Sequence, residues 1–91
     1  MTVRVSLSAQ FAELAGGSET LRLEGGTVAE VLRALADQHP SFRRLLWLPD
    51  GAANPVVVLA LNGRHLAGSA AAAAPLRDGD ELTLLSAVEG G

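Results

Sequence analysis

"TVAEVLRALADQHP", residues 27–40, is the stretch of sequence that decides the fold. Its apolar side chains recur at helical spacing and its charged ones fall on the opposite side, which is the pattern of an amphipathic helix. The apolar positions are Val28, Val31, Leu32 and Leu35, and the charged ones are Glu30, Arg33 and Asp37. Thr27 followed by Glu30 is a capping box, and Pro40 ends the helix. The stretch therefore predicts a helix with one apolar face.

Two strands are predicted before this helix. Val3–Ser8 alternates apolar and polar residues, and Thr20–Glu24 repeats the alternation. The glycine pair at 16–17 supplies a turn between them, so the two strands are expected to form a hairpin with a long loop. Within this loop, Phe11 and Leu14 are expected to pack over the end of the core.

Further strands are predicted after the helix. Residues 42–46 fit a short helical turn, and 55–66 is a β-branched run that reads as a strand buried on much of both faces. Asn62-Gly63 inside this run favours a tight hairpin turn, because both residues tolerate positive φ. A small-residue linker at 67–80 then leads to a last strand, Glu81–Ser86.

This order of elements predicts an α+β fold. One helix covers only one face of a four- to five-stranded mixed sheet, which gives two layers. Two strands, a helix and further strands, with the last returning to the middle, describe a β-grasp, or ubiquitin-like, fold; the strand order is taken from analogy. We expect a β-grasp domain at 1–87 and a flexible C-terminal tail at 88–91, with no second domain.

Composition excludes several classes of function. The chain has 91 residues, no cysteine and a net charge of −3, which excludes disulfides and thiolate metal sites and disfavours nucleic acid as a partner. All basic residues are arginine. No run is apolar for long enough to span a membrane, and the alternating N-terminus is not a signal peptide, so we expect a cytoplasmic protein.

The usual catalytic and metal-binding constellations are missing from the sequence. His39 and His65 have no nearby carboxylate partners, so they are expected to be surface or capping residues. The acidic run at 78–81 lacks the spacing of a calcium loop, and Ser86 has no base beside it in sequence. We therefore expect no metal, no bound cofactor and no enzymatic turnover by the chain alone. Trp47 is expected to close the rim of the core.

The last segment, "LLSAVEGG" at 84–91, offers a different chemistry. Two residues without Cβ form a strip thin enough to enter a narrow channel, with the carboxylate of Gly91 at its tip. A carboxylate reacts only after an enzyme has converted it to an acyl-adenylate with ATP, and sulfur can then displace AMP to give a thiocarboxylate. The other glycine pairs, 16–17 and 25–26, fall where turns are needed, so a glycine pair by itself means little.

Leu85 is a candidate docking residue beside this segment. Strand alternation aims it away from the helix-covered core, next to one of two possible sets on the neighbouring strand. These sets are Val56, Val58 and Ala60, or Val57, Leu59 and Leu61. Such an apolar patch favours protein docking, unless the segment 42–55 covers it.

With these elements assigned, the chain resembles the MoaD/ThiS family of ubiquitin-like sulfur carriers. The matching pieces are "VRVSLSAQFAELAG", "TVAEVLRAL", "LNG" and "LRDGDELTLLSAVEGG". The resemblance implies that Gly91 is adenylated by a ubiquitin-activating-like adenylyltransferase, which uses ATP, and then carries sulfur as a thiocarboxylate to a sulfur-accepting synthase. It further implies the roles of the remaining site residues: Gly90 as the slim approach, Ala87, Val88 and Glu89 as the threaded tail, and Leu85 as the docking position.

Two departures bear on the pathway. Ser86-Ala87 stands where molybdopterin-type members often carry two prolines, and the 42–55 insertion makes the chain longer than thiamine-type carriers. Both features look more like carriers for cysteine or natural-product synthesis. Two alternatives remain: a ubiquitin-like modifier conjugated through Gly91 to lysines of other proteins, and a β-grasp interaction module in which the glycine pair is incidental.

Overall fold

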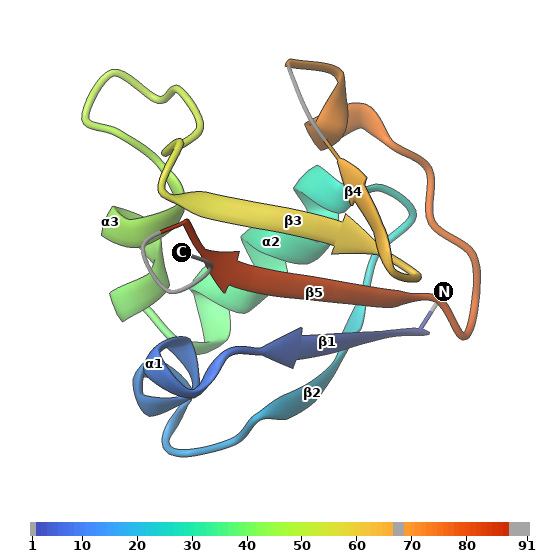
Figure 1. The fold of residues 1–91 in the computed structure, drawn as a ribbon, viewed down its shortest axis with the longest axis horizontal. Helices are drawn as coiled ribbons and strands as arrows, with labels where there is room; N and C mark the ends of the chain where they lie inside the picture. Colours follow the sequence, from blue (N-terminus) through green and yellow to red (C-terminus); the bar gives the residue numbers. More distant parts are fainter. Residues whose placement is uncertain (1, 67–68, 88–91) are drawn as a thin grey trace.

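The computed structural model describes residues 2–66 and 69–87. Its central element is a five-stranded mixed sheet (Figure 1). The strands are β1 (Thr2–Leu7), β2 (Thr20–Glu24), β3 (Val57–Leu61), β4 (Arg64–Leu66) and β5 (Glu81–Ser86). The helices are α1 (Ala9–Ala12), α2 (Val28–Gln38) and α3 (Ser41–Leu46), with 3₁₀ turns η1 (Glu13–Ala15) and η2 (Ser69–Ala73).

The strand order is β2-β1-β5-β3-β4, so the last strand lies in the middle of the sheet. β5 runs parallel to β1 on one side and antiparallel to β3 on the other, while β1–β2 and β3–β4 are antiparallel hairpins. This confirms the β-grasp prediction, including the return of the last strand to the centre.

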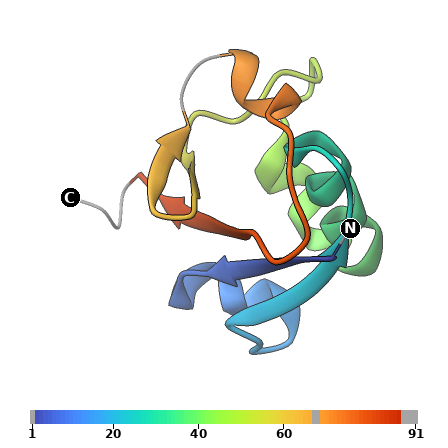
Figure 2. The same cartoon turned by 90° about the vertical axis from the view of Figure 1, so that its right-hand side faces the viewer.

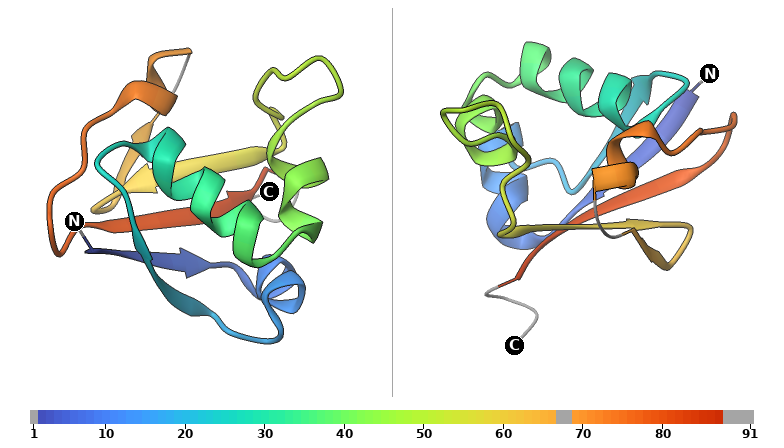
Figure 3. Two further views of the ribbon diagram at one scale, coloured as in Figure 1. Left: turned by 180° about the vertical axis from the view of Figure 1, so that it is seen from behind. Right: turned by 90° about the horizontal axis from the view of Figure 1, so that it is seen from above.

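The helices cover one face of the sheet and leave the other open (Figures 2 and 3). The core between the layers is built mainly by α2 and by the inward side chains of β1 and β5. Its fully buried members are Val3, Val5, Leu23, Val28, Val31, Leu35, Phe42, Leu82 and Leu84. In the described part of the chain, no helix has the length and apolar character needed to cross a membrane.

The predicted capping box forms at the start of α2, shifted by one residue in one of its two bonds. The backbone N–H of Glu30 donates to Thr27 Oγ1 at 3.3 Å, as expected. The Glu30 carboxylate accepts from the N–H of Gly26 at 2.7 Å, one residue before the cap. Both bonds satisfy donors at the start of the helix that have no helical partner. His39 caps the other end, immediately before Pro40.

Two burial predictions were wrong. Phe11 is buried as predicted, but Leu14 does not pack over the core: it is 37% exposed, and Ala15 is buried instead. The tight η1 turn before Gly16 aims Ala15, and not Leu14, inward. The strand β3 is half-buried along its whole length instead of deeply buried, because its edge neighbour β4 has only three residues and no layer covers its outer side.

α3 and Trp47, which directly follows it, pack on the helix side of the sheet. Phe42 and Leu46 are buried, and Trp47 is half-buried against the core, as predicted for a rim residue. Asn54 joins the two elements: its Nδ2 donates to the carbonyl of Leu45 at 2.9 Å, and its Oδ1 accepts from the N–H of Val56 at 3.1 Å. The two ends of the insertion are therefore held, at α3 and at Asn54, while residues 48–53 between them are exposed.

The β3–β4 turn is tied to the start of β5 by one asparagine. Asn62 and Gly63 have φ of 51° and 83°, which confirms the predicted tight turn. Asn62 Oδ1 accepts from the N–H of Glu81 at 2.9 Å, and its Nδ2 donates to Asp80 Oδ1 at 3.1 Å. The other Asp80 oxygen accepts from the N–H of Arg77 at 2.8 Å. These bonds, with the Arg77 one the strongest cause, hold the pKa of Asp80 below its usual range.

We predict that Gly25→Ala destabilises the protein much more than Gly26→Ala. A Cβ at Gly25 would lie 2.8 Å from Val31 Cγ2 and 3.0 Å from the Val31 backbone nitrogen, so α2 would have to move. At Gly26 the nearest atom is Glu30 Oε1 at 3.5 Å, an ordinary contact. We expect a loss of about 1–3 kcal/mol for Gly25→Ala and about 0.5 kcal/mol or less for Gly26→Ala in urea unfolding. Equal losses would contradict this account of the close approach.

We predict that Asp80→Asn makes stability less dependent on pH in the acidic range. A carboxyl whose folded pKa is lowered adds stability above its unfolded pKa, and this stability is lost as pH falls through the folded pKa. The variant should melt below the parent at pH 7, and the gap should narrow as pH falls toward 3. Melting curves across this range measure the gap. A gap that stays constant with pH would show that the Asp80 charge does not contribute.

Candidate functional site

The predicted site lies at the end of β5, and the structure describes two of its residues, Leu85 and Ala87. The other predicted site residues, Val88, Glu89, Gly90 and Gly91, lie outside the described residues. The described part of the site is the end of β5, residues 85–87, which we call the platform.

The platform is held by hydrogen bonds on both sides of β5. Pairing with β3 reaches Ser86, which is opposite Val57 and only 4% exposed. One residue further, the N–H of Ala87 donates to the carbonyl of Val56 at 2.8 Å. A proline at 87 has no backbone N–H and could not donate this bond. Alanine at this position therefore allows the pairing to continue. The ladder therefore continues to Ala87, which is exposed.

Leu85 faces the open side of the sheet and is 40% exposed. Its register partner on β3 is Val58, and Ala60 is opposite Thr83. Because Val57, Leu59 and Leu61 pack against the core instead, the first of the two predicted sets is the outward one. We call Val58, Ala60 and Leu85 the outer apolar patch.

The segment 42–55 does not cover this patch. Its buried side chains, Phe42 and Leu46, belong to the core on the opposite face of the sheet. Figure 3 shows α3 and the following loop on the α2 side. The alternative in which this segment buries Leu85 is therefore wrong, and the outer apolar patch is open to solvent.

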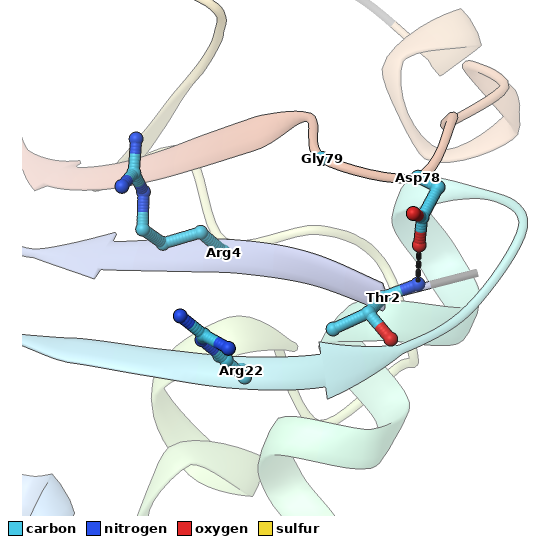
Figure 4. Close-up of a pocket in the computed structure, with 5 residues that line it drawn as sticks. All are labelled: Thr2, Arg4, Arg22, Asp78 and Gly79. Carbon is cyan, nitrogen blue, oxygen red and sulfur yellow. Dashed lines mark hydrogen bonds between the residues drawn. The ribbon is translucent and has the colours of Figure 1, made fainter.

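The hollows of the described structure include one on each side of the sheet. An apolar groove of about 110 Å³ lies on the helix side, among Leu32, Trp47, Val57, Leu59 and their neighbours. A polar hollow of about 330 Å³ lies on the open face, lined by Thr2, Arg4, Arg22, Asp78 and Gly79 (Figure 4). Sequence reasoning missed both, because each combines residues from distant segments.

Histidines and carboxylates do not gather into a metal site. Among the described residues, no group of three histidine, aspartate or glutamate side chains could hold a metal ion. His39 caps α2, and His65 is exposed on β4 opposite Ala60. The acidic run at 78–81 forms a turn, with φ of 88° at Gly79, and the start of β5.

The family comparison gives one match, to a model described as "ThiS family", over residues 5–91. The solved structures similar to the chain include SAMP1, small archaeal modifier protein 1, from Haloferax volcanii, at 31% identity and a TM-score of 0.85, covering 100% of both chains. A comparison with curated proteins gave no match.

Two further similar structures contain proteins called CysO. CysO from Mycobacterium tuberculosis is 25% identical with a TM-score of 0.83, over 93% of this chain and 98% of that one. The BexX/CysO complex of Amycolatopsis orientalis contains a chain that is 26% identical with a TM-score of 0.84, over 98% of this chain and 99% of that one. At least one similar protein has therefore been crystallised with a partner protein.

We predict that truncation of Leu84 destabilises the protein much more than truncation of its neighbour Leu85. Leu84 is fully buried, so Leu84→Ala should cost about 2–5 kcal/mol of unfolding free energy. Leu85→Ala removes a partly exposed side chain and should cost less than about 1 kcal/mol. Urea unfolding of both variants measures the difference. A large loss at Leu85 would mean that the outer apolar patch is covered in the free protein.

Proposed function

The chain belongs to the ThiS family, and from this premise we propose that it carries sulfur on the carboxyl group of Gly91. Members of this family are small ubiquitin-like sulfur carriers that are not enzymes themselves and act with partner enzymes. The observation that carries the proposal is the extent of the family match, which runs to residue 91 and so includes the Gly90-Gly91 pair.

The proposed chemistry proceeds in two steps on the Gly91 carboxylate. A ubiquitin-activating-like adenylyltransferase joins the carboxylate to the AMP portion of ATP and releases pyrophosphate. Sulfide then attacks the acyl carbon and AMP leaves, so that one oxygen of the carboxylate is replaced by sulfur. No electrons are gained or lost, and ATP is bound and consumed by the partner.

The platform described above supports this chemistry. β5 is paired with β1 as far as Leu84 and with β3 as far as Ser86, and the bond from Ala87 to Val56 fixes the base of the 88–91 segment. Four extended residues reach about 13 Å from that base, and glycines without Cβ allow a narrow approach to a partner's active site. The outer apolar patch lies beside this base and provides the surface for docking the adenylyltransferase.

The thiocarboxylate is proposed to give its sulfur to a biosynthetic synthase. Serine and alanine at 86–87, in place of two prolines, favour a cysteine or natural-product pathway over a molybdopterin pathway. The insertion at 42–55 argues in the same direction against a thiamine-type carrier. To test this, the sulfur-loaded chain is incubated with the synthase that is encoded nearest its gene. Loss of sulfur from the chain is measured by intact-protein mass spectrometry.

A second candidate function is favoured by the similarity to SAMP1, a protein named as a modifier. In that case the activated Gly91 carboxylate would be joined to lysines of other proteins. Blots of cell extract for a tagged chain separate the two functions, because conjugation produces bands of high mass and sulfur transfer does not.

We predict that the chain gains mass when it is incubated with its adenylyltransferase, ATP and sulfide. The gain should equal the replacement of one oxygen by one sulfur, measured on the intact protein. Deletion of Gly91 should abolish it and leave thermal unfolding nearly unchanged, because glycine has no side chain to bury. If the deleted chain were modified as well as the parent, Gly91 would not be the carrier position.

A further inference from the structure

Two arginines lie opposite each other on the open face of the sheet, at the end away from Ala87. The β1–β2 register pairs Arg4 with Arg22, and both side chains are exposed. In Figure 4, Arg4 reaches toward β5 and Arg22 lies along β2. Like charges directly opposite on neighbouring strands destabilise a sheet. The register therefore places two positive charges on neighbouring strands at this point.

Three carboxylates lie near this arginine pair, and each already has a partner. The Arg4 Nε lies 3.1 Å from Glu81 Oε2, which compensates that charge. The other two carboxylates accept hydrogen bonds from Thr2. Its N–H donates to Asp78 Oδ1 at 2.9 Å, and its Oγ1 donates to Glu24 Oε1 at 2.7 Å. The hydrogen bond from Thr2 is the largest cause that holds the pKa of Glu24 below its usual range.

Arg22 is thus the guanidinium of the pair that has no carboxylate of its own. Within residues 2–66 and 69–87, neither of the described ion pairs includes it; they join Arg4 to Glu81 and Arg43 to Asp37. The hollow of about 330 Å³ beside Arg22 is open at the surface, so a carboxylate from another molecule can reach it. Guanidinium is well suited to such a contact, because its N–H groups match the two oxygens of a carboxylate.

The outer apolar patch lies on the same face. Arg22, Arg4 and Glu81 form one row across three strands, and Leu85 lies four positions further along β5. Standard strand spacings place Leu85 about 16 Å from the Arg22 position. An apolar contact is not directional, whereas a charge pair at a distance from it fixes orientation.

We propose that Arg22 binds a carboxylate of the adenylyltransferase while the outer apolar patch is docked, and so sets the orientation in which the partner receives Gly91. The partner surface would carry an apolar contact and an aspartate or glutamate about 16 Å apart. Charge complementarity selects the carboxylate, because Arg22 is in neither ion pair of the described residues. This inference rests on the proposed function, since it assumes that the adenylyltransferase is the partner.

The test measures KM and kcat for the chain as substrate of its genomically encoded adenylyltransferase. Arg22→Gln should raise KM about 2–5-fold, and Arg22→Glu about 10-fold, with little change in kcat. Arg33→Gln is the matched control, because Arg33 is an exposed arginine on α2, in the opposite layer. Raising the salt concentration should increase the KM of the parent by a larger factor than the KM of Arg22→Gln. The free Arg22→Gln chain should melt at the parent's temperature or above it.

The outcomes separate the inference from the proposed function. If the parent is modified but Arg22→Gln and Arg33→Gln have the same KM, the inference fails and the proposed function stands. If the parent is not modified at all, both fail. A dimer of the parent that dissociates in Arg22→Gln, seen by sedimentation, would assign this face to a second copy and also overturn the inference. A lower melting temperature for free Arg22→Gln would show that Arg22 stabilises the fold and is not held for a partner.

Discussion

The double pairing of β5 is the constraint on which the rest of the structure depends. β5 is hydrogen-bonded to β1, from the beginning of the chain, and to β3, from its second half. The two hairpins of the sheet are therefore joined only when the last strand is in place. This topology also carries the end of β5 to an exposed edge of the molecule, with the ladder intact up to Ala87.

Alternation along β5 divides two tasks between the faces of one strand. Leu82, Leu84 and Ser86 are buried against the helical layer and supply stability. Leu85 lies on the open face, where it joins residues of β3 in a surface that costs little to change. Because the two faces are separate, the outer apolar patch can vary without weakening the core, and its proposed docking to the adenylyltransferase does not draw on core residues.

Polar side chains fix the ends of the elements instead of their middles. Asn62 ties the β3–β4 turn to the start of β5, and Asn54 ties α3 to β3. Each asparagine bonds at least one backbone group of a neighbouring segment close to a chain reversal. On the open face, by contrast, Arg4 is paired with Glu81 and Arg22 is in neither ion pair of the described residues, which is why we assign Arg22 to recognition of a partner.

The sequence alone determined those features that depend on local chemistry. Thr27, Glu30 and the apolar positions after them specify α2 with its cap, and Asn62-Gly63 specifies a tight turn, since capping, periodicity and positive φ act over a few residues. The tertiary structure decided which of Leu14 and Ala15 enters the core, which set of β3 residues faces outward with Leu85, and that Arg4 is opposite Arg22. These depend on register between segments far apart in the chain, and a shift of one residue would exchange every side chain between the two faces.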